Sequence, residues 1–361
     1  MKSRILALLV LTFFFSGCTQ LSTIPASSNT AGESENVTVA DINSAQDGTT
    51  EDMASSPDED IASEELAEEI FGLEAEEAIA EQSDGDNLVS AFETEVSMDQ
   101  SQTEQESVRA LCREIGNKLG SVSVEDCLAQ PLKFAGGYTV QSRPIVIRDF
   151  YPEGQEDSSD GPRILIMGGI HGDEYSSISI MFKWMEMLDQ VGETDFRWRF
   201  APTVNPDGLL DGQAIRQNAN GVDLNRNFPS DDWFDLAQDY WTTTTNRNPR
   251  RFPGTYPASE PEVQWIVEQI HNFKPDVIVS VHAPYHLLDY DGPSDPPQRI
   301  GELHLHLLGV YPGSLGNYAG LDLGLPVVTM ELPSAGIMPT DEQIISMWQD
   351  LQDWLHKNHD S

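Results

Sequence analysis

From residue 108 on, short runs rich in apolar residues alternate with segments of helical spacing. The short runs, which are typical of strands, cover residues 163–169, 196–203, 276–281 and 327–331. Helical spacing is found at 108–120, 176–190, 261–272 and 341–356. This alternation predicts an α/β domain with a largely buried central sheet and helices on both faces. Functional residues are then expected at strand ends and in the loops beyond them.

The polar first third of the chain has a different pattern. Residues 19–107 are rich in Glu, Asp, Ser, Ala and Thr and contain no Lys or Arg. Like charges repel there, and too little apolar surface is available to offset the entropy of ordering the chain. We expect a disordered acidic linker over residues 18–107 and one folded domain over residues 108–361. The whole chain has 20 basic and 60 acidic residues, which argues against nucleic acid as a partner because phosphate binding relies on clustered cations.

The first residues have the pattern of an export signal. A positively charged start precedes an apolar run, residues 5–15, that is too short to span a bilayer as a mature helix. Phe15-Ser-Gly-Cys18 then resembles the lipobox of bacterial lipoproteins, with Phe where Leu is usual. The resemblance implies that residues 1–17 are a signal peptide and that a lipid on Cys18 anchors the protein to a membrane. Thr19 favours the outer membrane of a Gram-negative bacterium, facing the periplasm. An ordinary signal peptide is the alternative.

Two further cysteines, Cys112 and Cys127, stand at the start of the predicted domain without a histidine between or beside them. A metal site is therefore not indicated. In an oxidising periplasm these thiols are expected to form a disulfide, and buried free thiols are the alternative.

Polar residues that suit a metal site follow three predicted strands. His171 and Glu174 stand three positions apart at the entrance of a helix and offer an imidazole and a carboxylate, a mixed set that zinc accepts in catalytic sites. By itself this spacing is more often a surface or capping pair. His282 ends another strand and completes three ligands, and Glu331 ends the last strand. Each of these two would otherwise be an ordinary structural residue.

A loop rich in arginine and amide side chains lies between the predicted strands 196–203 and 276–281. It runs Arg216-Gln-Asn-Ala-Asn-Gly-Val-Asp-Leu-Asn-Arg-Asn-Phe-Pro229. These side chains suit a site that holds a carboxylate bidentately and stabilises a developing oxyanion. A turn-rich surface loop is the alternative.

Taken together, these motifs resemble the zinc metallocarboxypeptidases of the carboxypeptidase A type, over about residues 135–357. The matching motifs, in order, are His171-x-x-Glu174, Asn205-Pro-Asp-Gly208, the run 216–228, Ser259-Glu-Pro-Glu262, His282 and Glu331. Finer features look most like the bacterial murein peptide amidase branch, which acts on the bond between γ-D-glutamate and meso-diaminopimelate. These features are His282-Ala-Pro, Asp289-Tyr-Asp-Gly-Pro293 and Pro312-Gly-Ser-Leu-Gly316.

The resemblance implies a zinc carboxypeptidase-like fold with a mixed sheet, and one zinc ion in the catalytic domain. His171, Glu174 and His282 would be its ligands, with water in the open fourth position. Glu331 would be the general base that takes a proton from this water and later gives one to the leaving amine. Arg216 would stabilise the tetrahedral oxyanion.

The resemblance also implies how the substrate binds. Asn225 and Arg226 would bind the carboxylate of the released residue. Tyr311 is the nearest counterpart of the family's tyrosine, at a different spacing from the following Gly-Ser. Asp289 and Asp291 place two carboxylates near the pocket, and we hypothesise that one of them, Asp291, contacts the ammonium of diaminopimelate. A turn stabilised by Asp side chains is the alternative.

The sequence therefore predicts a periplasmic, lipid-anchored zinc amidase or carboxypeptidase of murein-derived peptides. A zinc carboxypeptidase of ordinary peptides is one alternative. A zinc deacylase of N-acyl amino acids, of the aspartoacylase and succinylglutamate desuccinylase kind, is another. A non-catalytic binding module on the same scaffold is disfavoured, because a binding module needs no general base.

Overall fold

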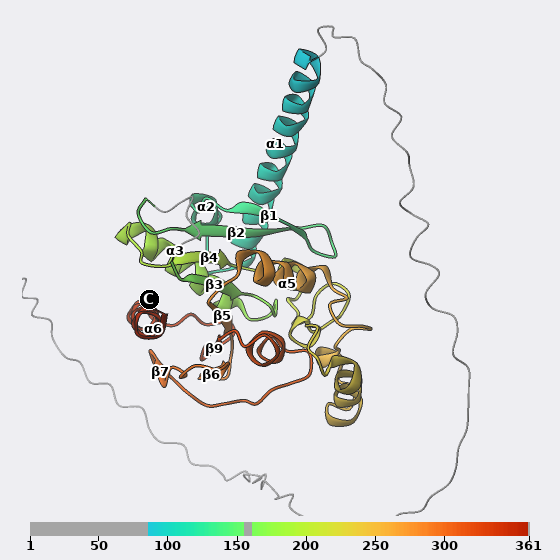
Figure 1. The fold of residues 1–361 in the computed structure, drawn as a ribbon, viewed down its shortest axis with the longest axis vertical. Helices are drawn as coiled ribbons and strands as arrows, with labels where there is room; N and C mark the ends of the chain where they lie inside the picture. Colours follow the sequence, from blue (N-terminus) through green and yellow to red (C-terminus); the bar gives the residue numbers. More distant parts are fainter. Residues whose placement is uncertain (1–85, 155–160, 360–361) are drawn as a thin grey trace, which may run out of the picture. The chain divides into compact units, whose positions relative to one another are not determined.

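A seven-stranded mixed sheet is the centre of the computed structural model, which describes residues 86–154 and 161–359 (Figure 1). The strand order is β1-β2-β4-β3-β5-β9-β6. Their bounds are β1 Lys133–Tyr138, β2 Pro144–Phe150, β3 Arg163–Gly168, β4 Arg197–Ala201, β5 Val277–His282, β6 Leu287–Asp291 and β9 Val327–Glu331. The four central strands β4, β3, β5 and β9 are parallel, and the others add antiparallel at the two edges. A short hairpin pairs β7 Arg299–Ile300 with β8 Leu303–His304.

Helices pack on both faces of this sheet, as the alternation of strands and helices predicted. Along β3, the fully buried Ile164 and Ile166 belong to one apolar cluster, and Leu165 and Met167 belong to the other, because successive side chains of a strand point to opposite faces. The first cluster includes residues of α1 Asp86–Lys118, α3 Tyr175–Val191 and α6 Asp341–His359. The second includes residues of α5 Pro261–Phe273 and the π-helix η5 Gly316–Asp322. The predicted fold class is confirmed.

Short helices fill the long connection between β4 and α5. They are α4 Pro206–Leu210, η1 Leu224–Arg226, η2 Trp233–Ala237, η3 Tyr240–Thr244 and η4 Pro249–Arg251. The arginine- and amide-rich run, residues 216–229, therefore lies within a long connection that contains several short helices.

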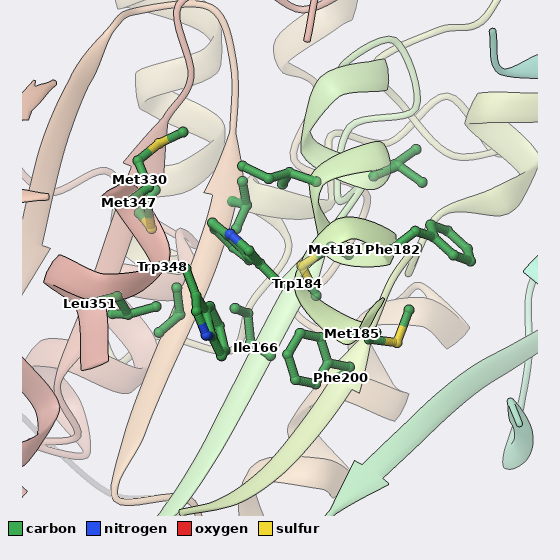
Figure 2. Packing of buried hydrophobic residues seen from close by; sticks show 14 of the residues in the cluster. Ile166, Met181, Phe182, Trp184, Met185, Phe200, Met330, Met347, Trp348 and Leu351 are labelled. Carbon is green, nitrogen blue, oxygen red and sulfur yellow. The ribbon is translucent and has the colours of Figure 1, made fainter. Parts of the chain in front are cut away.

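Aromatic packing fixes α3 against the sheet and α6. Figure 2 shows Trp184 of α3, Trp348 of α6 and Phe200 of β4 in the same cluster. The ring centroids of Trp184 and Trp348 are 5.5 Å apart, and those of Trp348 and Phe200 are 6.2 Å apart. Truncation of a buried Trp to Ala costs about 3–5 kcal/mol. This packing matters for the site, because the residue before α3 is Glu174.

The first helix begins well before the expected domain boundary. The sequence analysis expected the linker to continue through residue 107, whereas α1 is described from Asp86. The C-terminal half of α1 packs on the sheet through Val108, Leu111 and Ile115. From this anchor a helix extends at little cost per residue, because the preceding segment, residues 86–107, has no Gly or Pro and contains four Glu and three Gln residues. Composition alone did not indicate this continuation.

A disulfide joins Cys112 of α1 to Cys127 of α2 Val124–Ala129. Both residues are buried in the first apolar cluster. The predicted pairing is confirmed, and it fastens the end of the long helix to the segment that leads into β1.

The expected signal peptide 1–17, the lipidation site Cys18 and the linker as far as residue 85 lie outside the described residues. Among the residues that are described, none of the helices has both the length and the apolar character required to cross a membrane.

Candidate active site

The turn between β3 and α3 presents the first two candidate ligands. β3 ends at Gly168, His171 lies in the turn, and Glu174 precedes the first residue of α3. Gly172 allows the close packing of this turn, because a Cβ atom there would lie 2.1 Å from the carbonyl carbon of Gly208 in α4. The two motifs His-Gly-Asp-Glu and Asn-Pro-Asp-Gly thus pack directly on each other.

The third candidate ligand comes from the neighbouring strand. β5 is parallel to β3 and ends at His282, so both strands deliver their last residues to the same edge of the sheet. His171 Nδ1 lies 2.8 Å from Glu174 Oε1, and His282 Nδ1 lies 3.1 Å from Glu174 Oε2 and 3.2 Å from His171 Nδ1. The ligand atoms of these three buried residues all lie within 4.8 Å of one another.

The outer nitrogens of both histidines are held by hydrogen-bonding partners. His171 Nε2 is 3.1 Å from Asp223 Oδ1, and His282 Nε2 is 3.0 Å from Ser280 Oγ. A ligand histidine typically donates its outer N–H to such a partner, which directs the lone pair of the other nitrogen toward the metal. Two imidazoles and one carboxylate that converge in this way match a catalytic zinc site with an open fourth position. The residues present therefore fit a zinc ion.

For both Glu174 and Glu331, burial raises the pKa of the carboxyl group and the neighbouring histidines lower it. Burial alone would raise the pKa of Glu174, but His171 and His282 outweigh it and hold this pKa below its usual value. Burial raises the pKa of Glu331, which lies opposite His282 in the pairing of β5 with β9 and is within 3.4 Å of the N–H of Tyr285. A carboxylate with a raised pKa beside a metal site is suited to accept and return a proton.

Arg216 is buried against the same centre. Its Nε donates to Asp223 Oδ2 at 2.9 Å, and its Nη1 lies 3.1 Å from His171 Nδ1 and 3.6 Å from Glu174 Oε1. Burial alone would lower the pKa of Arg216, but Asp223 outweighs it and raises this pKa. A positive charge therefore lies beside two of the candidate metal ligands, His171 and Glu174.

Arg226 is buried with part of its hydrogen-bonding capacity unused. Its Nη1 donates to the carbonyl of Asn225, while its Nε has no hydrogen-bond partner among the described residues. Burial lowers the pKa of Arg226 to about 10, and the ring of Tyr311 lies 4.5 Å from its guanidinium carbon. Asn225 accepts from the N–H of Leu315 through Oδ1, which leaves its side-chain NH₂ available for a ligand. Arg226 and Asn225 together can bind a carboxylate.

Asp289 and Asp291 lie in the edge strand β6, not in a turn as one alternative held. They point to the same face of the strand, because they are two residues apart. Burial, followed by the charge of Asp289, raises the pKa of Asp291 to about 6. Within the described part of the chain, no ion pair involves either carboxylate. Gly316 makes room for Asp291, because a Cβ atom on Gly316 would lie 1.9 Å from Asp291 Oδ2.

These groups meet in one cavity of about 400 Å³. Of the residues singled out from the sequence, its lining includes His171, Arg216, Asn225, Arg226, His282, Asp289, Asp291, Tyr311 and Glu331. Glu174 contacts both histidines from just outside this lining. The sequence motifs, although separated by up to 160 positions, therefore converge on a single site.

Comparisons with known proteins identify a family and several similar proteins. The zinc carboxypeptidase family matches residues 133–299. Murein peptide amidase A of Escherichia coli is 33% identical over 201 residues, which are 54% of this chain and 81% of that protein. The chain belongs to the zinc carboxypeptidase family. Murein peptide amidase A of Vibrio campbellii is 31% identical over 204 residues, which are 55% of this chain and 77% of that protein. Among solved structures, murein-tripeptide amidase from Escherichia coli O157 has 27% identity and a TM-score of 0.45, and covers 62% of this chain and 91% of its own.

Membership of the zinc carboxypeptidase family makes this protein a zinc metallopeptidase and implies a zinc ion. The converging atoms of His171, Glu174 and His282 are the possible metal site of the described residues.

Two functional candidates escaped the sequence analysis. Asp223 lies inside the motif run, but nothing in its spacing showed that it bonds both His171 and Arg216. Arg251 also lines the cavity. The only sequence signal for Arg251 was its place in a basic pair, Arg250-Arg251, after a proline.

Proposed function

We propose that this protein is a periplasmic zinc amidase of peptidoglycan-derived peptides that hydrolyses the bond between γ-D-glutamate and meso-diaminopimelate. The observation that carries the proposal is the charge pattern of the cavity. Arg226, a buried guanidinium whose Nε has no hydrogen-bond partner among the described residues, lines the same space as Asp289 and Asp291, beside the candidate metal centre. Neither of these two carboxylates takes part in an ion pair within the described residues.

Diaminopimelate has the groups that this pattern requires. Its acylated end carries a carboxylate next to the scissile nitrogen. Arg226 binds this carboxylate bidentately, and Asn225 binds it through its side-chain amide. Its far end carries a free ammonium, which Asp291 binds with the help of Asp289. Two neighbouring carboxylates, one buried and one partly buried, repel each other in the free protein, and an ammonium ligand relieves this cost. The likeness to murein peptide amidases supports the same substrate class.

In this proposal His171, Glu174 and His282 hold the zinc ion. When bound, the zinc ion acts as a Lewis acid that activates water and polarises the scissile carbonyl. Glu331 takes a proton from the attacking water as the new carbon–oxygen bond forms. Arg216 stabilises the negative charge that develops on the carbonyl oxygen. Glu331 then gives its proton to the leaving nitrogen as the carbon–nitrogen bond breaks.

A carboxypeptidase of ordinary peptides that end in Lys or Arg is the second candidate. The same acidic pair would bind their side chains, and the same Arg226 would bind their terminal carboxylate. A zinc deacylase of N-acyl amino acids would need only the carboxylate-binding part of the site. The cavity offers two opposite charges at separate places, which favours a released residue that is itself both acidic and basic.

Location is part of the proposal. An export signal with a lipid on Cys18 would place the enzyme at the outer membrane, and an acidic linker would hold it away from anionic surfaces. Cell fractionation of the full chain and a Cys18→Ser variant tests this. The wild type is expected in the outer-membrane fraction and the variant in the soluble periplasm, whereas a soluble wild type would contradict lipid anchoring.

The activity is tested with the zinc-loaded chain and the tripeptide L-Ala-γ-D-Glu-meso-diaminopimelate. Mass spectrometry is used to detect free diaminopimelate, with the Glu331→Gln variant as the control for metal-assisted catalysis. The wild type is expected to release diaminopimelate. The variant is expected to bind zinc equally well and to turn over at least about 100-fold more slowly.

The outcomes separate the candidates. Release by the wild type alone supports both the substrate and the role of Glu331. A folded, zinc-replete chain that leaves the tripeptide intact but removes Lys from an ordinary peptide would replace this proposal by the second candidate.

A further inference from the structure

The short helix η4 places an additional arginine, Arg251, on the wall of the cavity. This helix is fastened to the loop that carries Arg216. Gln217 Nε2 donates to the carbonyl of Pro249 at 2.8 Å, and the N–H of Asp223 donates to the carbonyl of Phe252 at 2.8 Å. The backbone on both sides of Arg251 is therefore held in place, so that its side chain starts from a defined position beside the metal centre.

The guanidinium of Arg251 has no close partner among the described residues. Its nearest carboxylate is Asp223, at 4.0 Å between Nη1 and Oδ2, and its side chain is 31% exposed. Asp223 is already engaged, since Oδ2 accepts from Arg216 and Oδ1 contacts His171. The neighbouring Arg250 differs in this respect, because its Nη1 donates to Asp173 Oδ2 at 2.8 Å. One arginine of the pair is thus bonded within the protein, and the other faces the cavity.

Positive charge accumulates around this cavity beyond the needs of one carboxylate. Arg216, Arg226 and Arg251 all line it. Burial lowers the pKa of Arg226, Asp223 raises it, and the charges of Arg216 and Arg251 lower it further, so both neighbouring arginines disfavour the cation of Arg226. In the proposed function Arg226 binds the carboxylate of the released residue and Arg216 faces the reacting carbonyl. The proposed function assigns no group of the substrate to Arg251.

The acyl side of the proposed substrate offers a second carboxylate. In a γ-linked glutamyl residue the α-carboxylate is free, and only the side-chain methylenes separate its Cα from the reacting carbonyl. An ordinary α-linked peptide has a neutral backbone amide there. Arg251 and Arg216 approach the same oxygen of Asp223, at 4.0 Å and 2.9 Å, so Arg251 lies beside the arginine to which the proposed function assigns the reacting carbonyl.

We propose that Arg251 binds the free α-carboxylate of the γ-linked glutamyl residue and selects γ-glutamyl amides over ordinary peptides. The inference rests on the proposed function and names the acyl-side recognition that the proposed function leaves open. Arg251 touches the substrate away from the bond that breaks, so it acts mainly on binding.

The test uses two peptides with the zinc-loaded full chain. One is L-Ala-γ-D-Glu-meso-diaminopimelate, and the other has the glutamyl α-carboxylate converted to a carboxamide. Steady-state kcat and KM are measured for the wild type and for Arg251→Gln, Arg251→Lys and Arg250→Gln. Circular dichroism and zinc content show whether each variant is folded and loaded.

The wild type is expected to prefer the acid over the carboxamide by about 10- to 100-fold in kcat/KM, as for loss of a charge-assisted hydrogen bond. Arg251→Gln should lose this preference through a higher KM for the acid, and the carboxamide peptide should change by less than about twofold. Arg251→Lys should recover part of the preference, because it keeps the charge without the planar fork. Arg250→Gln should keep the preference of the wild type.

Three results would overturn the inference. A wild type that cleaves both peptides equally well would show that the α-carboxylate is not recognised. An Arg251→Gln variant that is equally impaired on both peptides would assign Arg251 to the released residue or to the shape of the loop. A wild type that cleaves neither peptide would overturn the proposed function and this inference with it.

Discussion

Replacement of Asp291 by Asn removes a charge from the cavity with almost no change of shape. Asp291 and Asp289 share one face of β6, and burial with the charge of Asp289 raises the pKa of Asp291 to about 6. At neutral pH the wild-type carboxylate is ionised and can bind the ammonium of diaminopimelate. The Asn variant can accept a hydrogen bond but offers no charge.

The size of the effect follows from the loss of one charge-assisted interaction. Such a loss costs about 1.5–3 kcal/mol, and about 1.4 kcal/mol corresponds to a factor of ten. Because Asp291 is only partly buried and Asp289 remains beside it, we expect the lower end of this range. The kcat/KM for the diaminopimelate tripeptide should therefore fall by about 10- to 30-fold.

The assay compares this tripeptide with one that ends in 2-aminopimelate, which has the same carbon chain and both carboxylates but lacks the second amine. The Asp291→Asn variant should lose most of the preference for diaminopimelate and keep its activity on the 2-aminopimelate peptide. Asp295→Asn is the control, because Asp295 is exposed on the following loop, and it should behave as the wild type. If Asp291→Asn retains the full preference, Asp291 does not contact the ammonium.

The same residue predicts a pH dependence of the preference. Below its pKa of about 6, Asp291 in the free enzyme is protonated and neutral. The ratio of kcat/KM for diaminopimelate to kcat/KM for 2-aminopimelate should therefore rise as the pH rises through about 6, since kcat/KM reports the free enzyme. The variant should show a flat ratio, and a wild-type ratio that falls over this range would refute the reasoning.

Three further predictions concern the support of the site, the metal and the fold. Gly316→Ala should displace the Asp291 carboxylate, since the new Cβ would lie 1.9 Å from Oδ2, and kinetics should show a reduced preference for diaminopimelate. Gly336→Ala, where a Cβ meets nothing within 4 Å, should leave the preference intact. Removal of zinc by 1,10-phenanthroline should abolish hydrolysis, and stoichiometric zinc should restore it in the wild type but not in His282→Ala; full activity of the metal-free enzyme would contradict the metal site. Replacement of both Cys112 and Cys127 by Ser should lower the free energy of unfolding by about 3 kcal/mol, for a closed loop of about 15 residues. Guanidinium denaturation measures this change, and an unchanged midpoint would show that the disulfide adds no stability.

The central part of the fold could be predicted from the sequence because its strands are buried on both faces. β3, β5 and β9 are mainly apolar, and each ends in a polar residue or is followed by a polar motif that the parallel arrangement brings to one edge of the sheet. An apolar run with a polar end can be recognised within a short stretch of sequence. It led directly to His171, His282 and Glu331.

The edges of the fold were harder to predict because their patterns are weak. β1 contains two adjacent glycines, and β6 carries two aspartates on one face, so neither has the composition of a buried strand. The start of α1 depends on packing that begins further along the chain, at Val108. A domain boundary that is predicted from composition alone takes no account of that packing.

Contacts between side chains far apart in the chain also lay beyond the reach of the sequence. Asp223 bonds His171 across 52 positions and Arg216 across 7, and only the folded loop brings the three together. The incomplete pairing of Arg251 became visible in the same way, from the distance to a carboxylate that two other groups already occupy.

The most direct test of the account is a competition between two tripeptides in one tube. Equal amounts of L-Ala-γ-D-Glu-meso-diaminopimelate and L-Ala-L-Ala-L-Lys are incubated with the zinc-loaded chain, and mass spectrometry follows both released residues over time. The account predicts that diaminopimelate is released first and Lys slowly or not at all, because only the murein peptide has groups for Arg226, Asp291 and Arg251 together. Equal or faster release of Lys would contradict it and would identify an ordinary carboxypeptidase.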